Sequence, residues 1–477
     1  MAAQYGLIGL GVMGENLALN IADHGFSLAV YNRTAEKTRA FLEGAARGRA
    51  ISATYSIPEL VAALERPRRI IVMVSAGKAV DAVLQELRLH LTAGDIVVDA
   101  GNSLYTDTER RARELAADGL RYVGMGVSGG EEGARWGPSL MPGGPRDAYD
   151  ELAPMLTRIA AQVEDGPCVT YVGPGGAGHY VKMVHNGIEY GDMQLIAETY
   201  ALMKHALGLG PRQMSEIFAA WNQSELNSFL IELAAIVLAH VDPDTGEPLV
   251  ELIVDTAEQK GTGRWTVQSA LELGVPVPTI FAAVWTRTLS SDKDLRVTAS
   301  HRLAGPASGV PADPGALLSA LRPALYAAKI SSYAQGMALL RAASQEFGYG
   351  IDYAEIARIW KGGCIIRARL LNLIQQAYRH DPALENLLLA PEFAEAVSSR
   401  HEAWRQVVAT GHQLGVACPA FSASLDYYDT LRTARLPANL VQALRDAFGA
   451  HTYQRVDRPG IYHTEWLPPR EGSAAPR

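Results

Sequence analysis

The stretch that decides the fold lies close to the N-terminus and reads Tyr5-Gly-Leu-Ile-Gly-Leu-Gly-Val-Met-Gly14. It contains a G-x-G-x-x-G pattern, formed by Gly9, Leu10, Gly11, Val12, Met13 and Gly14. An apolar run typical of a strand precedes this pattern and a helical pattern follows it, which is the context in which such a loop holds the pyrophosphate of a dinucleotide. The glycines permit a tight turn and close approach of the backbone, while the helix N-terminus faces the phosphate charge. An ordinary glycine-rich turn is the weaker alternative.

Short β-rich runs alternate with helical patterns through the first 176 residues. The strand-like runs are Tyr5–Leu10, Ser27–Tyr31, Arg69–Val74, Asp95–Asp99 and Arg121–Gly124. This alternation predicts a parallel sheet with helices on both faces. We therefore expect an α/β, Rossmann-like dinucleotide-binding domain over residues 1–176.

The composition changes beyond the glycine-rich stretch Gly173-Pro-Gly-Gly-Ala-Gly178. β-Branched runs become scarce, and Ala, Leu, Glu and Met recur at helical spacing until about Leu436. This pattern predicts a large all-α domain over residues 177–436. A C-terminal tail over residues 437–477 follows, and we expect its last residues, 471–477, to be disordered.

The helical region contains a pattern that recurs once. Gly208-Leu-Gly210 and Trp221 return as Gly348-Tyr-Gly350 and Trp360. The separation is far longer than a solenoid repeat, so we expect an internally duplicated domain with two similar helical halves.

The bulk composition limits the classes of function. The chain has 477 residues, of which 48% are hydrophobic and 20% charged, and its net charge is −8. This acidic balance argues against a nucleic-acid partner, although a local basic pocket for an anionic substrate would not show in the total. The three cysteines are far apart in the sequence, which fits a reducing compartment.

Two further features concern the cellular location. The N-terminus enters an apolar strand at once, without a basic leader or a cleavage site. The most apolar later run, Phe229–Val241, is shorter than the roughly 20 residues of a membrane span. We expect a buried helix in this run, no membrane segment, and a cytoplasmic location.

The end of the second predicted strand indicates which dinucleotide binds. NAD-binding folds usually carry an acidic residue there, which holds the ribose hydroxyls. Here the chain reads Tyr31-Asn32-Arg33-Thr34, without a carboxylate that would repel a 2′-phosphate. Arg33 offers a guanidinium fork and Thr34 a hydroxyl, and one charge-assisted bond contributes roughly 1.5–3 kcal/mol. NADP is therefore expected over NAD, against the alternative that Arg33 is an ordinary surface arginine.

A polar stripe runs along the helix predicted from His179 to Glu198. Its members are Lys182, His185, Asn186, Glu189 and Met193. Their spacing places them on one face of the helix. This face is either a solvated surface or a functional stripe, and the apolar character of the other faces favours the second. Lys182 and Glu189 are separated by about 10.5 Å along the helix axis, which suits two groups that flank a small substrate.

At this helix the sequence resembles the family of decarboxylating 6-phosphogluconate dehydrogenases, and the likeness extends from Gly9 to about Trp466. The motifs that carry it are Gly9–Gly14, Asn32-Arg-Thr34, Asp99-Ala-Gly-Asn-Ser103, Gly126-Val-Ser-Gly-Gly130, Lys182–Tyr190, Gln259-Lys-Gly-Thr-Gly263 and Leu444-Arg-Asp-Ala-Phe-Gly-Ala-His-Thr-Tyr453. The resemblance implies an NADP-dependent homodimer that converts 6-phospho-D-gluconate to D-ribulose 5-phosphate and CO2 in the pentose phosphate pathway. Shorter β-hydroxyacid dehydrogenases share only the first half of the pattern.

The resemblance also implies the catalytic roles. Lys182 would be the general base that takes the proton of the 3-hydroxyl, which requires that its pKa be lowered toward about 7–8. Protonated Lys182 would then stabilise the oxyanion that develops as the carboxylate leaves. Glu189 would be the general acid that protonates carbon 1 of the enediol. No metal is implied, because the ketone itself accepts the electrons.

The binding residues implied by the resemblance fall into three groups. The dinucleotide would contact Gly9, Leu10, Gly11, Val12, Met13, Gly14, Asn32, Arg33, Thr34, Val74, Ser75, Ala76 and Asn102. The substrate's carboxylate and hydroxyls would contact Asn102, Ser128, Gly129, Gly130, His185 and Asn186. Its phosphate would contact Tyr190, Lys260 and Arg287, together with Arg445 and His451 from the tail of the partner subunit.

The sequence departs from the family pattern at Ser75, where a lysine is common, at Ala282, where a glutamate is frequent, and at Ser224, where a glycine is frequent. These departures bear on affinity more than on chemistry. Two alternatives stay open at this point. A β-hydroxyacid dehydrogenase for an unphosphorylated acid would be favoured by loss of the phosphate ligands. A non-catalytic NADP-binding protein would be favoured by loss of Lys182 or Glu189.

Overall fold

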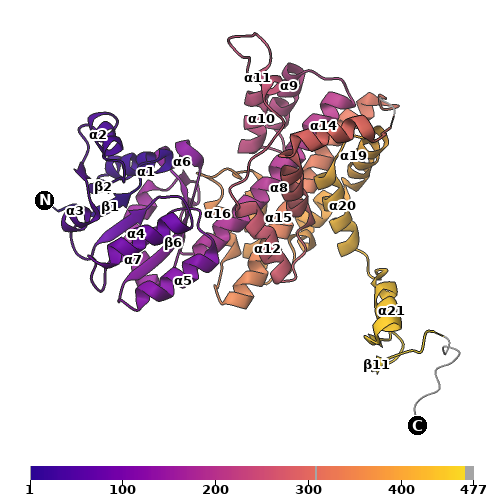
Figure 1. Ribbon diagram of the computed structural model, residues 1–477. Coiled ribbons are helices and arrows are strands. Elements are labelled where there is room, and N and C mark those ends of the chain that lie inside the picture. The colour runs from indigo at the N-terminus through magenta and orange to yellow at the C-terminus, as the bar shows by residue number, and fades with distance from the viewer. Residues whose placement is uncertain (1, 307–308, 468–477) are drawn as a thin grey trace. The chain divides into compact units, whose positions relative to one another are not determined.

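The computed structural model describes residues 2–306 and 309–467, and the chain divides into two compact units, Met1–Leu425 and Asp426–Arg477. The disorder expected for residues 471–477 lies outside the described residues. The first unit begins with a sheet and continues with a large helical part (Figure 1). The second unit is the C-terminal tail.

The sheet has seven strands in the order β3-β2-β1-β4-β5-β6-β7. Neighbouring strands are parallel as far as β6, and β7 is antiparallel to β6. The strands are β1 Tyr5–Ile8, β2 Leu28–Tyr31, β3 Ile51–Thr54, β4 Arg69–Val72, β5 Ile96–Asp99, β6 Arg121–Ser128 and β7 Ser139–Gly143. The Rossmann-like parallel sheet is therefore confirmed.

Two strands, β3 and β7, were not expected from the sequence, and both lie at the edges of the sheet. β7 reads Ser-Leu-Met-Pro-Gly, and its sequence does not indicate a strand because Pro142 and Gly143 are residue types that are rare in strands. Proline is tolerated at an edge because one side of such a strand needs no ladder donor. β3 is short and only half buried, so its apolar pattern is weak.

Helices cover both faces of the sheet, and each face has its own apolar cluster. Residues of α1 and α7 pack with Leu7, Val98 and Met125 on one face. Residues of α3, α4 and α5 pack with Ile8 and Val97 on the other. The helices of this part are α1 Val12–Asp23, α2 Ala35–Glu43, α3 Ile57–Ala62, α4 Lys78–Arg88, α5 Tyr105–Ala116, α6 Gly130–Trp136 and α7 Arg146–Ile159.

Two long helices, α8 (Ala177–His205) and α15 (Pro314–Phe347), pack against each other in the helical part (Figure 1). Glycines allow the close approach: a Cβ on Gly191 would lie 2.4 Å from Ser332 Oγ, and one on Gly336 would lie 2.5 Å from Ile188. Each long helix is followed by a left-handed glycine and a shorter helix, as the expected duplication requires. The shorter helices are α9 Pro211–Trp221 and α16 Tyr353–Ile359.

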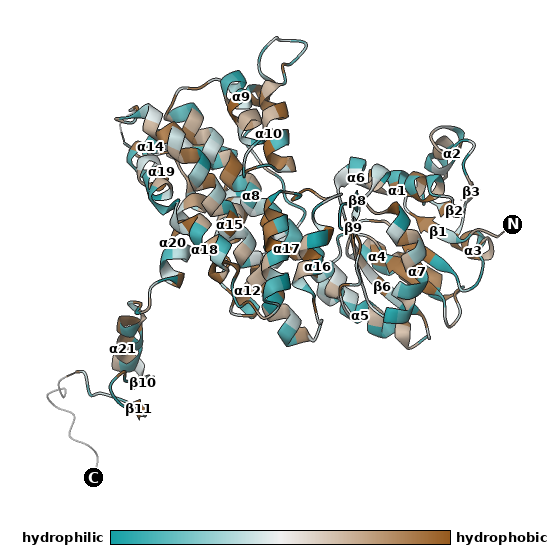
Figure 2. Ribbon diagram, turned by 180° about the vertical axis from the view of Figure 1, so that it is seen from behind, coloured by the Kyte–Doolittle hydropathy of each residue, from teal (hydrophilic) through white to brown (hydrophobic). Residues whose placement is uncertain are grey.

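The remaining helices surround this pair. They are α10 Phe229–Ala239, α11 Leu249–Leu252, α12 Thr262–Glu272, α13 Pro278–Ser290, α14 Lys293–Arg302, α17 Leu370–His380, α18 Pro391–Ser398, α19 His401–Leu414 and α20 Pro419–Leu431. The strongly hydrophobic α10 (Figure 2) corresponds to the run that was expected to be buried, but its Ile236 and Val237 are exposed. It is therefore buried on one side only. None of the helices in residues 2–306 and 309–467 is long and apolar enough to cross a membrane.

The tail unit is organised around a buried carboxylate. It contains α21 (Ala438–Gly449) and a short hairpin, β10 (Tyr453–Gln454) with β11 (Ile461–Tyr462). Asp446 accepts hydrogen bonds from the backbone N–H groups of Thr452 and Thr464 and from Trp466 Nε1, at 2.7 to 3.0 Å. These bonds, with the Asp446–His463 pair, hold the pKa of Asp446 far below its ordinary value despite the loss of hydration.

Candidate active site

A cleft of about 780 Å³ lies at the carboxyl ends of the central strands, where ligands bind in open α/β sheets. Many of the residues predicted to bind the cofactor line it, together with Lys260 from the helical part. The predicted residues in its wall are Gly11, Val12, Met13, Gly14, Val74, Ser75, Ala76, Asn102 and Lys260. Gly9, Leu10, Asn32, Arg33 and Thr34 are not among the lining residues.

The glycine-rich loop has the geometry that a pyrophosphate needs. Gly9 has φ +102°, and a Cβ on Gly14 would lie 1.9 Å from the Gly9 carbonyl, so larger residues would open the turn. Around Gly11 nothing lies within 4 Å of a Cβ, which leaves room for a ligand against the backbone. Helix α1 begins at Val12, and its free N–H groups face this space. The loop therefore fits a dinucleotide.

The residues after β2 divide into a structural and an exposed part. Asn32 Oδ1 accepts a hydrogen bond from Leu10 N at 3.0 Å, and Asn32 Nδ2 donates to Thr34 O, so Asn32 ties this corner to the glycine loop. Arg33 and Thr34 are exposed. Within the described residues Arg33 has no ion pair, which leaves its guanidinium available for a phosphate.

Replacing Arg33 with alanine is expected to raise the KM for NADP by roughly 10- to 150-fold, because one charge-assisted phosphate contact contributes about 1.5–3 kcal/mol. The KM for NAD should change little. Arg39→Ala is the matched control, because Arg39 is an exposed arginine nearby that pairs with Glu36. Steady-state kinetics with both dinucleotides measures the effect, and an equal loss with NAD would contradict the assignment.

Close packing seats the start of α8 against the sheet. A Cβ on Gly178 would lie 2.2 Å from Gly124 O, and one on Gly126 would lie 2.4 Å from Lys182 Cβ. Only glycine at these two positions lets the helix touch β6. Lys182 is therefore buried, with 6% of its surface exposed, near Ser128 at the end of that strand.

Three of the five predicted stripe residues, Lys182, His185 and Asn186, form a connected set of hydrogen bonds with Ser128. Lys182 Nζ donates to Asn186 Oδ1 at 2.6 Å and to Ser128 Oγ at 3.4 Å. His185 lies 3.0 Å from Asn186 Oδ1 through Nδ1 and 3.3 Å from Ser128 Oγ through Nε2. The directions agree if neutral His185 carries its proton on Nδ1 and accepts from Ser128. Asn186 also donates to Thr262 Oγ1 at 3.2 Å, which joins the stripe to α12.

Burial shifts the pKa values of the stripe in the directions that acid–base chemistry needs. Loss of hydration lowers the pKa of Lys182, although the Glu189 charge opposes this shift. Loss of hydration also raises the pKa of Glu189, against the opposing charges of Lys182 and Arg287. For His185, burial and the Lys182 charge hold the pKa well below its ordinary value, so the ring is neutral. Burial thus increases the fraction of Lys182 that is neutral and the fraction of Glu189 that is protonated near neutral pH.

The pH dependence of catalysis should be bell-shaped. The rate should rise as pH increases through the pKa of Lys182, which burial places below 10.5, and should fall as Glu189, with a pKa above 4.5, loses its proton. Glu189→Gln should lower steady-state turnover and remove the alkaline limb of its pH profile, whereas hydride transfer measured by rapid mixing should change little, because Glu189 acts after that step. An unchanged alkaline limb in this variant would assign the limb to another group.

Two of the predicted phosphate ligands, Tyr190 and Arg287, contact each other. The Arg287 guanidinium lies 3.7 Å from the centre of the Tyr190 ring, a cation–π contact that orients both groups. A Cβ on Gly263 would lie 2.5 Å from the same ring, so Gly263 makes room for it. Lys260 is exposed in the loop that precedes α12. The first unit thus contributes one cation stacked on the Tyr190 ring and a second, Lys260, that lines the cofactor cleft.

The remaining predicted substrate-binding residues lie at the start of α6 and in the tail unit. Gly129 and Gly130 have φ +113° and +62° at the start of α6, and Gly129 packs against Gly363 O, where a side chain would not fit. Arg445 and His451 belong to the tail unit and are exposed. The left-handed residues Ala450 and Thr452 flank His451 and turn the chain sharply there.

Several lining residues were missed by sequence reasoning. Trp265, Leu104, Asp107 and Val127 contribute to the wall of the cofactor cleft. Trp265 lies one helical turn after the predicted Lys260 motif, and this proximity was the only signal available. Trp360, whose ring meets His185 edge to face at 5.5 Å, was noted only as part of the internal repeat.

Hydride transfer to a dinucleotide needs such a cleft beside a base that can start neutral, and this combination defines the class of dinucleotide-dependent dehydrogenases. The chain belongs to the 6-phosphogluconate dehydrogenase family. The family's NAD binding domain matches residues 4–173, and its C-terminal domain matches residues 178–466.

Individual relatives cover nearly the whole chain. The decarboxylating 6-phosphogluconate dehydrogenase of Synechococcus elongatus is 61% identical over 97% of this chain and 99% of its own. The Bacillus subtilis protein, named NADP(+)-dependent and decarboxylating, is 54% identical over 97% and 99%. The solved 6-phosphogluconate dehydrogenase of Plasmodium falciparum, studied with NADP+ and with 6-phosphogluconate, is 45% identical, with a TM-score of 0.93 over 97% of this chain and 100% of that one.

Proposed function

We propose that this chain oxidises and decarboxylates 6-phospho-D-gluconate to D-ribulose 5-phosphate and CO2, with reduction of NADP to NADPH, in the pentose phosphate pathway. The observation that carries the proposal is the polar stripe on α8, in which buried Lys182 and partly buried Glu189 have pKa values shifted toward each other. Relatives of this name that cover nearly the whole chain support it.

In the proposed mechanism the side chains of this chain move two protons. Neutral Lys182 takes the proton of the 3-hydroxyl. NADP held at the glycine loop would supply the acceptor for the hydride of carbon 3. The ammonium of Lys182 then stabilises the oxyanion at carbon 3 as CO2 leaves. Glu189 finally protonates carbon 1 of the enediol. Asn186 keeps the Lys182 amine oriented, because its amide oxygen accepts from Nζ at 2.6 Å.

The substrate-binding roles follow from chemistry and position. Donors for the substrate's carboxylate and hydroxyls come from residues near the ends of β5 and β6. These residues supply amide, hydroxyl and backbone N–H groups; they are Asn102, Ser128, Gly129 and Gly130. His185 and Asn186 are already hydrogen-bonded side chains that a sugar hydroxyl can join. Tyr190, Lys260 and Arg287 provide one hydroxyl and two cations for the phosphate dianion.

The active form that we propose is a homodimer in which Arg445 and His451 complete the partner's site. Both residues are exposed in a unit of their own, and α21 carries exposed apolar side chains such as Phe448. Exposed large apolar side chains also gather on helices of the first unit; they are Ile236, Val237, Phe281, Trp285, Leu289 and Leu295. Apolar surface of this kind marks contacts between proteins.

A cytoplasmic location is also part of the proposal, supported by three cysteines that are all unpaired and buried. We also propose a three-part division at residues 176 and 436; the change from sheet to helix at Ala177 supports the first boundary, whereas the compact tail unit begins earlier than the second, at Asp426.

The test is to incubate the purified protein with 6-phosphogluconate and either dinucleotide. Absorbance of the reduced cofactor and release of CO2 should rise together, and faster with NADP than with NAD. Reduction without CO2 would contradict decarboxylation. Equal turnover of unphosphorylated gluconate would instead favour a β-hydroxyacid dehydrogenase.

A further inference from the structure

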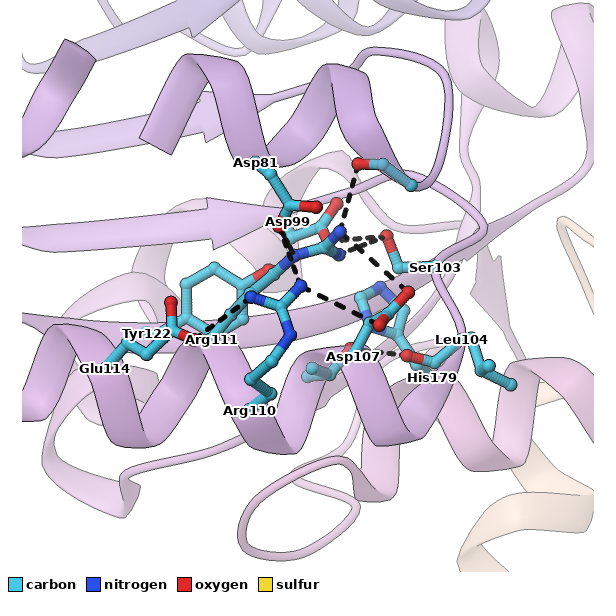
Figure 3. A network of polar contacts seen from close by, with 12 residues as sticks. Asp81, Asp99, Ser103, Leu104, Asp107, Arg110, Arg111, Glu114, Tyr122 and His179 are labelled. Atoms are coloured by element: carbon cyan, nitrogen blue, oxygen red, sulfur yellow. Dashed lines mark hydrogen bonds and ion pairs between the residues drawn. The ribbon is translucent and has the colours of Figure 1, made fainter. Parts of the chain in front are cut away.

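The buried guanidinium of Arg111 is the centre of a network of polar contacts that includes Asp81, Asp99 and Ser103 (Figure 3). The Arg111 side chain on α5 is 1% exposed, yet all three of its nitrogens donate. Nε donates to Asp81 at 2.8 Å, and Nη2 donates to the Gly77 carbonyl at 3.0 Å. Nη1 donates to Ser103 Oγ at 3.3 Å and faces Asp99 at 3.5 Å.

Two of these partners lie in different loops that contribute residues to the wall of the cleft. Gly77 ends the loop after β4 that contains the lining residues Val74 to Gly77. Ser103 directly follows Asn102 in the loop after β5. A guanidinium presents its donors in a rigid planar fork, so contacts from one fork hold the two loops at a defined separation.

The Asp99 carboxylate also holds the residues on both sides of Asn102 in place. It accepts from Gly101 N at 3.1 Å and from Ser103 Oγ at 2.6 Å, and these are the two neighbours of Asn102. Tyr122 OH donates to the same carboxylate at 2.8 Å. Because Asp99 is fully buried, the nearby Arg111 cation offsets the cost of its charge.

The same helix also contacts the start of α8. Thr108, one turn before Arg111 on α5, hydrogen-bonds His179 Nδ1 at 2.6 Å. His179 lies one turn before Lys182. Glu109 accepts from Gly176 N at 2.7 Å just ahead of α8. Helix α5 therefore connects the two cofactor loops with the helix that carries the base.

We propose that Arg111 is a positioning residue that sets the distance between the two cofactor loops and fixes their position relative to Lys182. The proposal rests on the proposed function, in which these loops hold NADP. It predicts that Arg111 affects cofactor binding and hydride transfer most, and affinity for the sugar phosphate less, through Asn102 alone.

The experiment compares Arg111→Gln with Arg110→Gln. Arg110 is the matched control, because it also donates to Asp81, at 2.9 Å, and pairs with Glu114, but contacts neither loop. Arg111→Gln should raise the Kd of NADPH and the KM for NADP by roughly 10-fold or more and lower kcat, since small displacements at a reacting centre cost up to about 100-fold. The KM for 6-phosphogluconate should rise by a smaller factor, because Asn102 is the one proposed substrate ligand next to this network, and Arg111→Lys should restore part of the loss. Arg110→Gln should leave all of these values near those of the wild type.

Ser103→Ala keeps the buried charges and loosens only the Asn102 loop, so it decides the matter if Arg111→Gln fails to fold. It should shift the Kd of NADPH in the same direction by a smaller factor, measured by titrating NADPH fluorescence. The proposal is overturned if the Arg111 and Ser103 variants change thermal stability but leave the NADPH Kd and the kcat unchanged. A wild-type protein that does not reduce NADP would instead contradict the proposed function.

Discussion

Lys182→Met is expected to lower kcat for 6-phosphogluconate oxidation by about 10,000-fold, the upper range for loss of a general base. The variant removes both the base for the 3-hydroxyl and the cation that stabilises the oxyanion during decarboxylation. Methionine has nearly the same length and is apolar, so it should keep the packing of Lys182 Cβ against Gly126. Folding and NADPH binding should therefore persist.

The comparison that gives this result its meaning is Lys182→Arg. Arginine retains the positive charge but cannot supply a neutral base near neutral pH. If the lysine acts by losing its proton, both variants should be inactive in initial-rate assays. An active arginine variant would show that only the charge matters, and an active methionine variant would remove Lys182 from the mechanism.

Loss of the two tail residues is expected to be almost as severe. The double variant Arg445→Ala, His451→Ala should nearly abolish activity, because each charge-assisted bond to the phosphate contributes about 1.5–3 kcal/mol. Arg455→Ala is the control in the same unit, since Arg455 pairs with Asp457 on the exposed hairpin. Thermal unfolding should show that the first unit is intact in both variants.

Mixing subunits tests whether the tail acts in the partner's site. The tail variant retains Lys182, and the Lys182→Met variant retains its tail, so a mixed dimer has one complete site. If subunits pair at random, the mixture should recover roughly a quarter of wild-type activity in a two-fold dimer. No recovery after verified subunit exchange would contradict completion across the dimer, and high activity of the tail variant alone would remove Arg445 and His451 from the site.

Local spacing allowed much of the site to be predicted. The stripe from Lys182 to Glu189 follows from helical periodicity, because residues three and four apart share a helix face wherever the helix lies. The glycine loop from Gly9 to Gly14 follows from the backbone freedom that a tight turn needs. Periodicity left undecided whether the stripe faces water or protein.

Packing between residues distant in sequence decides that the Lys182 end of the stripe faces protein. It also creates contacts that local patterns do not predict. Lys182 is buried because Gly126, more than fifty residues away in the sequence, leaves space for it on β6. Arg111 could equally be a surface residue of an amphipathic helix until Gly77 and Ser103 are brought to it. The edge strand β7 forms despite its proline because β6 supplies its ladder.

Element types, the glycine loop and the face that carries the proposed catalytic pair could thus be derived from neighbours along the chain, because helix and turn geometry are local properties. The pKa shifts of Lys182 and Glu189 and the links between the cofactor loops arise only on folding. They depend on burial and on contacts between residues distant in sequence, and no local spacing encodes the loss of hydration that drives them.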